Sequence, residues 1–296
     1  MIKDKTETIL VVDDTETNID ILLELLSSDY DVMVALDGVS ALEIAMDESV
    51  DLILLDIMMP EMDGYEVCKI LKKTDKTKDI PVIFITAKTD EDSIERAYDV
   101  GGIDYVTKPF KPKELFARVR TQLSMRSLIS NLEYIASHDQ MTGIYNRRKF
   151  FELSEYRFTR GLENLYAIMI DIDKFKAIND AYGHPTGDKV IKQTTKAINE
   201  QLNENAIFGR LGGEEFAIIC NLPTKDEVVQ MVDRIRKSVE QQVVLSDNAT
   251  VIKFTISLGL AKASAETKNL DYLLKESDIG LYEAKDRGRN RTVFRD

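Results

Sequence analysis

The stretch RLGGEEF, residues 210–216, places two glycines beside two glutamates, with apolar residues on either side. A glycine pair between apolar runs is typical of a β-hairpin turn. Two neighbouring carboxylates at the tip of a hairpin repel each other, and a nearby positive charge would relieve that repulsion. We therefore expect a hairpin that turns at Gly212 and Gly213 and presents Glu214 and Glu215 to a cation.

The segments around this hairpin predict an α+β domain. In chain order we expect a helix near 146–160, a strand at 165–171, helical segments to about 202, the hairpin, a helix near 225–241, a strand at 250–260 and a helix near 270–287. This order is the split βαβ arrangement, in which we expect helices to cover one face of an antiparallel sheet.

Asp171 ends the strand that would lie beside the hairpin, so Asp171, Glu214 and Glu215 are expected to meet at one edge. Carboxylates gathered in this way favour Mg²⁺, which usually also holds substrate phosphates. Glycine at positions 212 and 213 leaves room for a triphosphate. The simpler alternative, a tight turn with two solvated glutamates, does not explain the other residues of the domain.

The first part of the chain alternates between strand-like and helix-like segments. Short apolar runs lie at residues 9–12, 52–55, 82–85 and 105–107, and amphipathic segments lie near 17–28, 38–48, 63–74 and 91–99. Unbroken apolar runs rich in β-branched residues are typical of parallel strands that are buried on both faces. The alternation predicts a doubly wound α/β sheet, whose site lies beyond the carboxyl ends of the strands.

Polar side chains follow each of these strands. They are Asp13, Asp14, Asp56, Thr86 and Lys108. Three acids at one edge need a cation, and hard oxygen ligands suit Mg²⁺. A carboxylate beside Mg²⁺, with a lysine and a threonine nearby, can accept a phosphoryl group. Helix capping is the alternative, and it would account for one Asp but not for five suitable residues.

The motifs that contain these residues resemble those of a known family. The motifs VVDD, LLDIMMPEMDG, ITA and KPF, in this order, resemble the receiver domain of two-component response regulators. The resemblance implies that Asp56 is the phosphoacceptor and that Asp13 and Asp14 help it to hold Mg²⁺. It also implies that Thr86 and Lys108 contact the phosphoryl oxygens. Tyr105 falls where the family has its aromatic switch residue.

Residues 111–137 predict a helical connector. Apolar residues recur at a spacing of three or four, and Gly and Pro are absent from 114–137. The stripe consists of Leu115, Val119, Met125, Leu128, Ile129, Leu132, Ile135 and Ala136, and Gln122 and Arg126 interrupt it. The alternative is a last helix followed by a plain linker, but a linker would be rich in Gly, Ser or Pro. We expect one long helix whose exposed stretch pairs with a second chain.

Length and composition limit the number of domains, the partners and the cellular compartment that we expect. The length of 296 residues suggests two domains, and 44% hydrophobic residues suffice for two cores. A net charge of −13 disfavours nucleic acid and anionic membranes as partners. Cys68 and Cys220 fit buried free thiols in a reducing cytoplasm, and two histidines exclude a His-rich metal site. Without a signal peptide or a membrane-spanning apolar run, we expect a cytoplasmic protein.

The second domain resembles the GGDEF family, the diguanylate cyclases, in its GGEEF variant. The matching stretches are DQMTGIYNRR (139–148), DIDKFKAIND (171–180), GHPTGD (183–188), RLGGEEF (210–216) and LYEAKDRGRN (281–290). The resemblance implies a nucleotidyl-cyclase-like α+β fold and the joining of two GTP molecules into cyclic di-GMP. It implies that Asp171 and Glu214 bind Mg²⁺ with the Ile172 carbonyl, and that Glu215 shares metal binding or helps to deprotonate the 3′-hydroxyl. The division of these roles between the two glutamates stays open.

The same resemblance assigns residues to the substrate. Lys176 resembles a phosphate contact near the metal, and Asn179 and Asp188 resemble readers of guanine. Lys285 and Arg289 are four residues apart, so we expect them to share a helix face and to reach the terminal phosphates. Gly213 would lie against the substrate.

The expected chain therefore has a receiver domain (1–122), a helical coiled-coil connector (123–137) and a diguanylate cyclase domain (138–296). Each cyclase domain holds one GTP and the reaction needs two, so we expect a homodimer that pairs through the receiver and connector, under the control of a histidine kinase. Three alternatives are an inactive nucleotide-binding module, a scaffold acting only through its receiver, and a cyclase that also uses ATP. The intact metal residues oppose the first alternative, and the complete site of the second domain opposes the second. Asp188 opposes the third, because adenine has a bare N1 acceptor where guanine offers the adjacent N1–H and 2-amino donors.

One expected feature of the family is missing. Many similar cyclases carry an Arg-x-x-Asp product-inhibition site, whose residues here would be Asn203 and Ala206. Neither side chain can replace the guanidinium or the carboxylate. We expect little feedback through this site, although Arg147, Arg148 or Arg210 offer an alternative basis for product binding.

Overall fold

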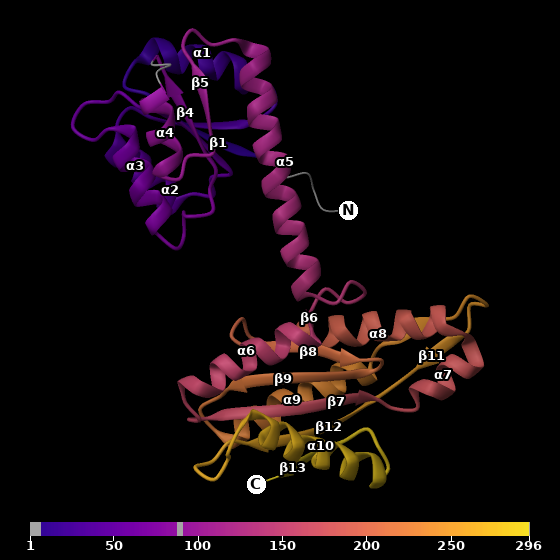
Figure 1. Ribbon diagram of the computed structural model, residues 1–296. Coiled ribbons are helices and arrows are strands. Elements are labelled where there is room, and N and C mark those ends of the chain that lie inside the picture. Colours follow the sequence, from indigo (N-terminus) through magenta and orange to yellow (C-terminus); the bar gives the residue numbers. More distant parts are fainter. Residues whose placement is uncertain (1–6, 88–90, 296) are drawn as a thin grey trace. The chain divides into compact units, whose positions relative to one another are not determined.

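The computed structural model describes residues 7–87 and 91–295 (Figure 1). The chain forms two compact units, which divide inside one helix between Asn131 and Leu132. The outer ends of the two expected domains, residues 1–6 and residue 296, lie outside the described residues. In the described part of the chain, none of the helices combines the length and the apolar character that crossing a membrane requires.

The first unit is a doubly wound α/β domain, as its alternating sequence predicts. Its five strands are parallel, in the order β2-β1-β3-β4-β5. The elements are β1 (Thr8–Val12), α1 (Glu16–Leu26), β2 (Asp31–Ala35), α2 (Gly38–Asp47), β3 (Leu52–Asp56), α3 (Gly64–Lys73), β4 (Val82–Thr86), α4 (Glu91–Asp99), β5 (Asp104–Thr107) and α5 (Pro112–Ser137).

Helices cover both faces of this sheet, which explains the unbroken apolar runs. Side chains of α2, α3 and α4 pack on one face, and side chains of α1 and α5 pack on the other. The central strands β1, β3 and β4 are buried along their whole length. Four of the five strands match the expected apolar runs. The fifth, β2, is an edge strand that is only partly buried, so its sequence carries a weaker signal.

Helix α5 is one uninterrupted helix of 26 residues, as the connector sequence predicts. Its first half packs on the sheet of the first unit through Leu115, Val119 and Leu123, which are all buried. Its second half keeps large apolar side chains in contact with solvent. The exposed fractions are 56% for Met125, 63% for Leu128, 52% for Ile129, 65% for Leu132 and 50% for Ile135.

The second unit is an α+β domain around a mixed six-stranded sheet, in the order β13-β12-β7-β9-β8-β6. A separate two-stranded ribbon pairs β10 with β11. The elements are β6 (Tyr145–Asn146), α6 (Arg147–Arg160), β7 (Leu165–Ile172), α7 (Phe175–Tyr182), α8 (His184–Asn199), β8 (Ile207–Gly212), β9 (Glu215–Asn221), α9 (Lys225–Glu240), β10 (Val243–Leu245), β11 (Val251–Lys253), β12 (Ile256–Lys262), α10 (Leu270–Asp286) and β13 (Thr292–Arg295).

The expectation that helices cover only one face of this sheet is wrong. Tyr166 and Ile168 of β7 pack among side chains of α8 and α9. Leu165 and Ala167, which alternate with them, pack on the opposite face among side chains of α6 and α10. Successive side chains of a strand point to opposite faces, so a strand without polar alternation must be covered on both sides.

The expectation of a single strand at 250–260 is also wrong, because the structure has two strands there. The chain breaks its extended pairing at Phe254 and Thr255, which separates β11 from β12. The break occurs because β11 leaves the large sheet to pair with β10, whereas β12 pairs with β7 and β13.

Helix α10 crosses β12 in very close contact. A Cβ atom added at Gly259 would lie 1.9 Å from the carbonyl oxygen of Ser277 and 2.1 Å from the amide nitrogen of Leu281. On the helix side, a Cβ atom at Gly280 would lie 3.1 Å or more from its neighbours. The two glycines therefore let the helix backbone rest directly on the strand.

We expect Gly259→Ala to destabilise the second unit by about 2 kcal/mol or more, because backbone atoms of α10 cannot move aside cheaply. Gly280→Ala is the matched control. It adds a methyl group at the same crossing but meets longer contacts, and it gains helix propensity. Urea unfolding of both variants measures the difference, and a wild-type midpoint for Gly259→Ala would contradict the close crossing.

Candidate functional site

The carboxyl ends of the receiver strands bring the expected residues together. Asp13 follows β1, Asp56 ends β3, and Lys108 follows β5. The Lys108 Nζ atom lies 2.8 Å from a carboxylate oxygen of Asp13 and 2.8 Å from one of Asp56. Asp13 is 0% exposed and Asp56 is 4% exposed. Burial raises the pKa of the Asp56 carboxyl, and the Lys108 ammonium opposes that rise.

Asp13, Asp14 and Asp56 form a set of acidic groups whose nearest oxygens all lie within 4.8 Å of one another. Within residues 7–87 and 91–295, no other three such groups come as close. Asp14 is exposed, so the set opens to solvent. The second oxygen of Asp13 accepts hydrogen bonds from Asn18 and from the backbone of Thr15, which fixes its orientation. This donor set fits a hard divalent cation.

The loop between β3 and α3 explains part of the LLDIMMPEMDG motif. A Cβ atom at Gly64 would lie 2.2 Å from the carbonyl oxygen of Asp56, so only glycine lets α3 begin this close to the strand end. Thr86, the last residue of β4, is buried. Tyr105 of β5 is half-buried, and the Arg118 guanidinium lies 5.6 Å from the centre of its ring.

The stretch RLGGEEF forms the expected hairpin between β8 and β9. Gly212 and Gly213 have φ angles of 156° and 51°, and Gly212 pairs with Glu215 across the turn. The Arg210 side chain donates a hydrogen bond to the Gly213 carbonyl at 2.9 Å, and it also pairs with Asp139 at 3.0 Å. The hairpin is thus tied to the turn that follows α5.

The edge of the sheet beside the hairpin is acidic. Asp171 of β7 pairs directly with Glu215 of β9, and the Lys285 ammonium lies 2.7 Å from an Asp171 carboxylate oxygen. Burial raises the pKa of the Asp171 carboxyl, Lys285 opposes the rise, and the charges of Glu214 and Glu215 add to it. The carboxylates at this edge therefore repel one another, as the sequence suggests, and a divalent cation would relieve that repulsion.

The other expected residues lie on the helices after β7. Asn179 of α7 and Asp188 of α8 are half-buried, and Lys176 is exposed. A Cβ atom at Gly187 would lie 2.0 Å from the Asn179 Oδ1 atom, so the two helices pack tightly at this point. That Oδ1 atom is buried and has no hydrogen-bond partner among the described residues. It remains an acceptor toward which a ligand can donate.

The expectation that Lys285 and Arg289 share a helix face is wrong. Helix α10 ends at Asp286, and Gly288 and Arg289 follow in the left-handed region with φ angles of 109° and 63°. The backbone nitrogen of Arg289 donates to the carbonyl of Ala284, which closes the helix end. The sequence RGRN contains the glycine that signals such a stop.

Two features of the site are absent from the sequence expectations. The first is the ion pair between Asp139 and Arg210, which lie 71 residues apart. The second is Asp173, which is buried and accepts hydrogen bonds from three residues on two segments of the chain. Both acidic residues lie inside the matched motifs, but their partners come from distant strands and turns, so no local pattern identifies them.

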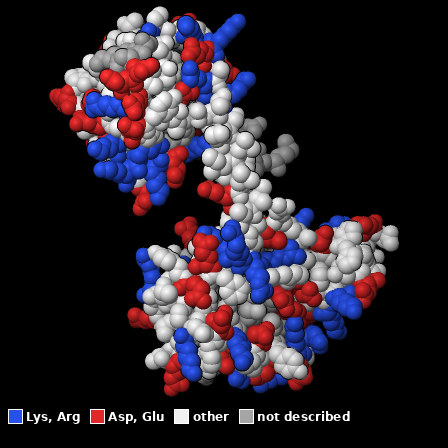
Figure 2. All heavy atoms as spheres, in the orientation of Figure 1, with Lys and Arg blue, Asp and Glu red and all other residues white. Residues whose placement is uncertain are grey.

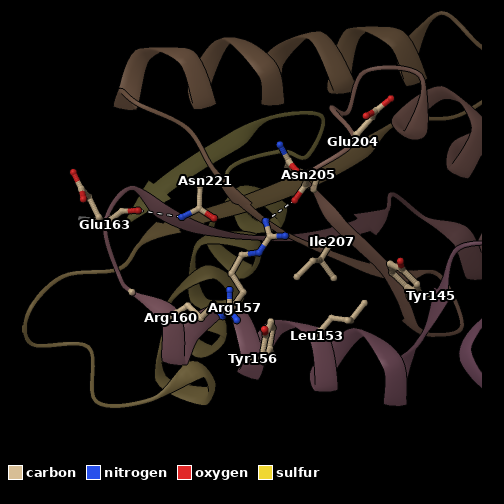
Figure 3. Close-up of a pocket in the computed structure, with 12 residues that line it drawn as sticks. Tyr145, Leu153, Tyr156, Arg157, Arg160, Glu163, Glu204, Asn205, Ile207 and Asn221 are labelled. Atoms are coloured by element: carbon tan, nitrogen blue, oxygen red, sulfur yellow. Dashed lines mark hydrogen bonds between the residues drawn. The ribbon is translucent and has the colours of Figure 1, made fainter. Parts of the chain in front are cut away.

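The region expected to lack a product-inhibition site contains a cavity. Ala206 helps to line a cavity of 640 Å³ between α6 and the start of β8, drawn in Figure 3. Arg157 extends from α6 and donates a hydrogen bond to the carbonyl of Asn205. The three arginines named from the sequence contact other groups. Arg210 bonds to the hairpin, Arg148 donates to the carbonyl of Ala136, and the Arg147 guanidinium lies 5.4 Å from the centre of the Phe151 ring.

Comparisons with known proteins agree with this geometry. The family model of the response regulator receiver domain matches residues 9–120, and that of the diguanylate cyclase GGDEF domain matches residues 136–291. Response regulator PleD of Caulobacter vibrioides is 30% identical over 296 residues, which cover 96% of this chain and 65% of PleD. The chain thus spans slightly less than two thirds of that relative.

Two further relatives match the second unit. Probable diguanylate cyclase DgcT of Escherichia coli is 36% identical over 166 residues, which cover 55% of this chain and 36% of DgcT. The crystal structure of the GGDEF domain of DgcB from Caulobacter crescentus, in complex with c-di-GMP, has a TM-score of 0.52 and 27% identity. It covers 54% of this chain and 93% of that domain. The chain therefore belongs to the GGDEF family of diguanylate cyclase domains and carries a response regulator receiver domain before it.

Proposed function

We propose that the chain is a phosphorylation-regulated diguanylate cyclase, which condenses two GTP molecules into cyclic di-GMP and two pyrophosphates. The observation that carries this proposal is the acidic edge formed by Asp171, Glu214 and Glu215 beside the glycine hairpin of a GGDEF domain. The relatives support it, because DgcT is named a probable diguanylate cyclase and the DgcB domain was crystallised with c-di-GMP.

In this proposal Asp171, Glu214, Glu215 and the Ile172 carbonyl hold Mg²⁺ at the sheet edge. When bound, the ion would acidify the attacking hydroxyl and neutralise charge on the triphosphate. Asn179 and Asp188 accept hydrogen bonds from guanine, and the unpartnered Asn179 Oδ1 atom supports this role. The phosphates lie beside Gly213 and are bound by Lys176, Lys285 and Arg289.

The chemistry is phosphodiester formation. The 3′-oxygen of one GTP bonds to the α-phosphorus of the other, the bond from that phosphorus to the bridging oxygen breaks, and pyrophosphate leaves. Glu214 or Glu215 takes the proton of the 3′-hydroxyl. The step occurs twice, once on each GTP. Because each domain holds one GTP, two domains must face each other, and the active species is a homodimer.

The receiver would control that pairing. Asp56 accepts a phosphoryl group from a histidine kinase, with Mg²⁺ held by Asp13, Asp14 and Asp56. Thr86 and Lys108 then contact the phosphoryl oxygens, and Tyr105 changes position, which biases a two-state surface. Lys108 already lies within 2.8 Å of both buried acids, so a new charge on Asp56 would redirect its ammonium group.

We assign residues 1–122 to the receiver, 123–137 to a coiled-coil connector and 138–296 to the cyclase. The exposed apolar side chains of α5 support pairing with a second chain. They recur at a spacing of three or four from Met125 to Ile135, and the exposed stretch of α5 is largely free of charged side chains on the face drawn in Figure 2.

Incubation of the full chain with GTP and Mg²⁺, with and without beryllofluoride as a phosphoryl mimic, tests the function. We expect cyclic di-GMP, with a higher rate when the mimic is present. Asp171→Asn should reduce kcat by about 100-fold or more, because a charged metal ligand is lost. Asp278→Asn, on the exposed face of α10, is the matched control and should retain the wild-type rate. Near-normal turnover in Asp171→Asn would rule out the metal assignment.

Helix α5 provides a second test. Inserting two residues after Ser130 would rotate everything beyond by about 200° at 3.6 residues per turn. We expect the beryllofluoride response to be lost. Inserting seven residues lengthens the helix more but restores the phase to within about 20°, so it should restore part of the response. Equal responses in both insertions would contradict transmission through a rigid paired helix.

Product feedback provides a third test. Asn203 and Ala206 supply neither a guanidinium nor a carboxylate, so added cyclic di-GMP should leave the initial rate of the wild type nearly unchanged. The double variant Asn203→Arg with Ala206→Asp should become sensitive. Strong inhibition of the wild type at low micromolar product, unaltered by the double substitution, would place feedback at another site.

A further inference from the structure

Asp173 is a buried acid for which the proposed reaction has no use. It lies two residues beyond Asp171 and is 7% exposed. Among residues 7–87 and 91–295, no Lys or Arg forms an ion pair with it. Its charge is instead satisfied by three donors: the Thr255 hydroxyl at 2.6 Å, the Ser257 hydroxyl at 2.6 Å and the Asn290 backbone nitrogen at 3.0 Å. A buried carboxylate without a cation needs such donors.

These donors come from two parts of the domain that are distant in the chain. Thr255 lies in the break between β11 and β12, Ser257 lies in β12, and Asn290 lies in the turn after α10. Asp173 also donates its own backbone N–H to the Thr255 carbonyl at 2.9 Å. One side chain therefore connects the end of β7, which carries the proposed metal ligands, to the turn that carries Arg289.

That turn has an unusual backbone. Arg289 and Asn290 have φ angles of 63° and 46°, and Lys174, next to Asp173, has a φ angle of 56°. Residues other than glycine seldom adopt such angles, and the conformation persists only where the surroundings fix it. The Asn290 side chain adds bonds to Arg236 and Glu240 of α9, and the Asn290 backbone N–H joins the turn to Asp173 at the end of β7.

The cationic side chains of these residues border one cavity. Lys174 and Arg289 line a cavity of 710 Å³, together with Asp173 and Asn290. Arg289 is exposed, and no described residue accepts a hydrogen bond from its guanidinium group. Its donors are therefore available for an anionic ligand such as a phosphate.

We propose that Asp173 is a positioning residue for the triphosphate end of GTP: its bond to the Asn290 backbone holds Arg289 beside the metal-binding edge. This inference rests on the proposed function, because it takes GTP as the ligand. Lys285 also links α10 to β7, through Asp171, but that ammonium is expected to turn toward substrate phosphates. Asp173 is not a proposed metal ligand, so its link to the turn persists while substrate binds.

The test compares Asp173→Ala with Asp173→Asn. Alanine leaves the Asn290 N–H without an acceptor, whereas the asparagine amide keeps one oxygen for it, and the Ser257 hydroxyl can rotate to accept from the amide nitrogen. We expect Asp173→Ala to raise the KM for GTP about tenfold or more, with kcat changed less than about threefold. Asp173→Asn should restore most of the affinity. Should Asp173→Ala fail to fold, Asp173→Ser carries the same expectation, because its hydroxyl is too short to reach the turn.

Ser257→Ala is the matched control. It removes a buried hydrogen bond to the other oxygen of Asp173, so it should lower the melting temperature but leave the KM for GTP within about twofold. Equal KM effects of Ser257→Ala and Asp173→Ala would reduce Asp173 to a stabilising residue and overturn the proposal.

Direct binding separates this inference from the proposed function. Calorimetry with a non-hydrolysable GTP analogue and with GDP needs no turnover. Asp173→Ala should weaken the binding of the GTP analogue but not the binding of GDP. The double variant Asp173→Ala with Arg289→Ala should bind the GTP analogue no more weakly than whichever single variant has the lower affinity. Additive losses, or equal losses for both nucleotides, would overturn the positioning role. A wild type that binds GTP but forms no cyclic di-GMP would refute the cyclase proposal alone.

Discussion

Repulsion between carboxylates at strand ends is the constraint on which both sites of this chain are built. In the receiver, burial disfavours the charged form of Asp56, which lies against Asp13. In the cyclase domain, Asp171 is in the same situation beside Glu214 and Glu215. In each site one lysine from another element, Lys108 or Lys285, forms an ion pair with a buried carboxylate. One ammonium cannot neutralise three acids, so each edge keeps an excess of negative charge.

Close backbone packing makes these edges possible. Gly64 lets α3 begin against the carbonyl of Asp56, and Gly259 lets α10 rest directly on β12. The second contact places the end of α10 where Lys285 reaches Asp171. The positions of the acidic residues and of Lys285 therefore depend on glycines outside the sites, because these glycines allow the helices to pack closely on the strands.

In the proposed function, the receiver domain senses a charge and the cyclase domain carries out a reaction that depends on pairing. In the proposed function, a phosphoryl group on Asp56 would add its charge beside the half-buried Lys108. A cyclase that needs two facing nucleotides changes its rate when two copies are differently arranged. Helix α5 connects the two domains: its first half is part of the receiver core, and its second half keeps large apolar side chains exposed to solvent.

The sequence alone was sufficient to predict the elements that neighbouring residues determine. Unbroken apolar runs predicted the central strands of the receiver, the glycine pair predicted the hairpin, and an uninterrupted apolar stripe predicted α5. The acids at strand ends could also be foreseen, because parallel strands end at a common edge and Asp171 pairs across the sheet with Glu215. These features depend on backbone periodicity and turn chemistry, which neighbouring residues determine.

Only the tertiary structure showed the features that depend on contacts between residues far apart in the sequence. The edge strand β2 lacks a strong local signal, and the layer of α6 and α10 on the second face follows from how the sheet is covered rather than from any one segment. Helix α10 ends at a local glycine signal, but the turn that follows it is bonded to Asp173, which is 117 residues from Asn290 in the chain. Hydrogen bonds to a buried carboxylate form only after the sheet has determined which segments meet, so the sequence showed the acid but not its partners.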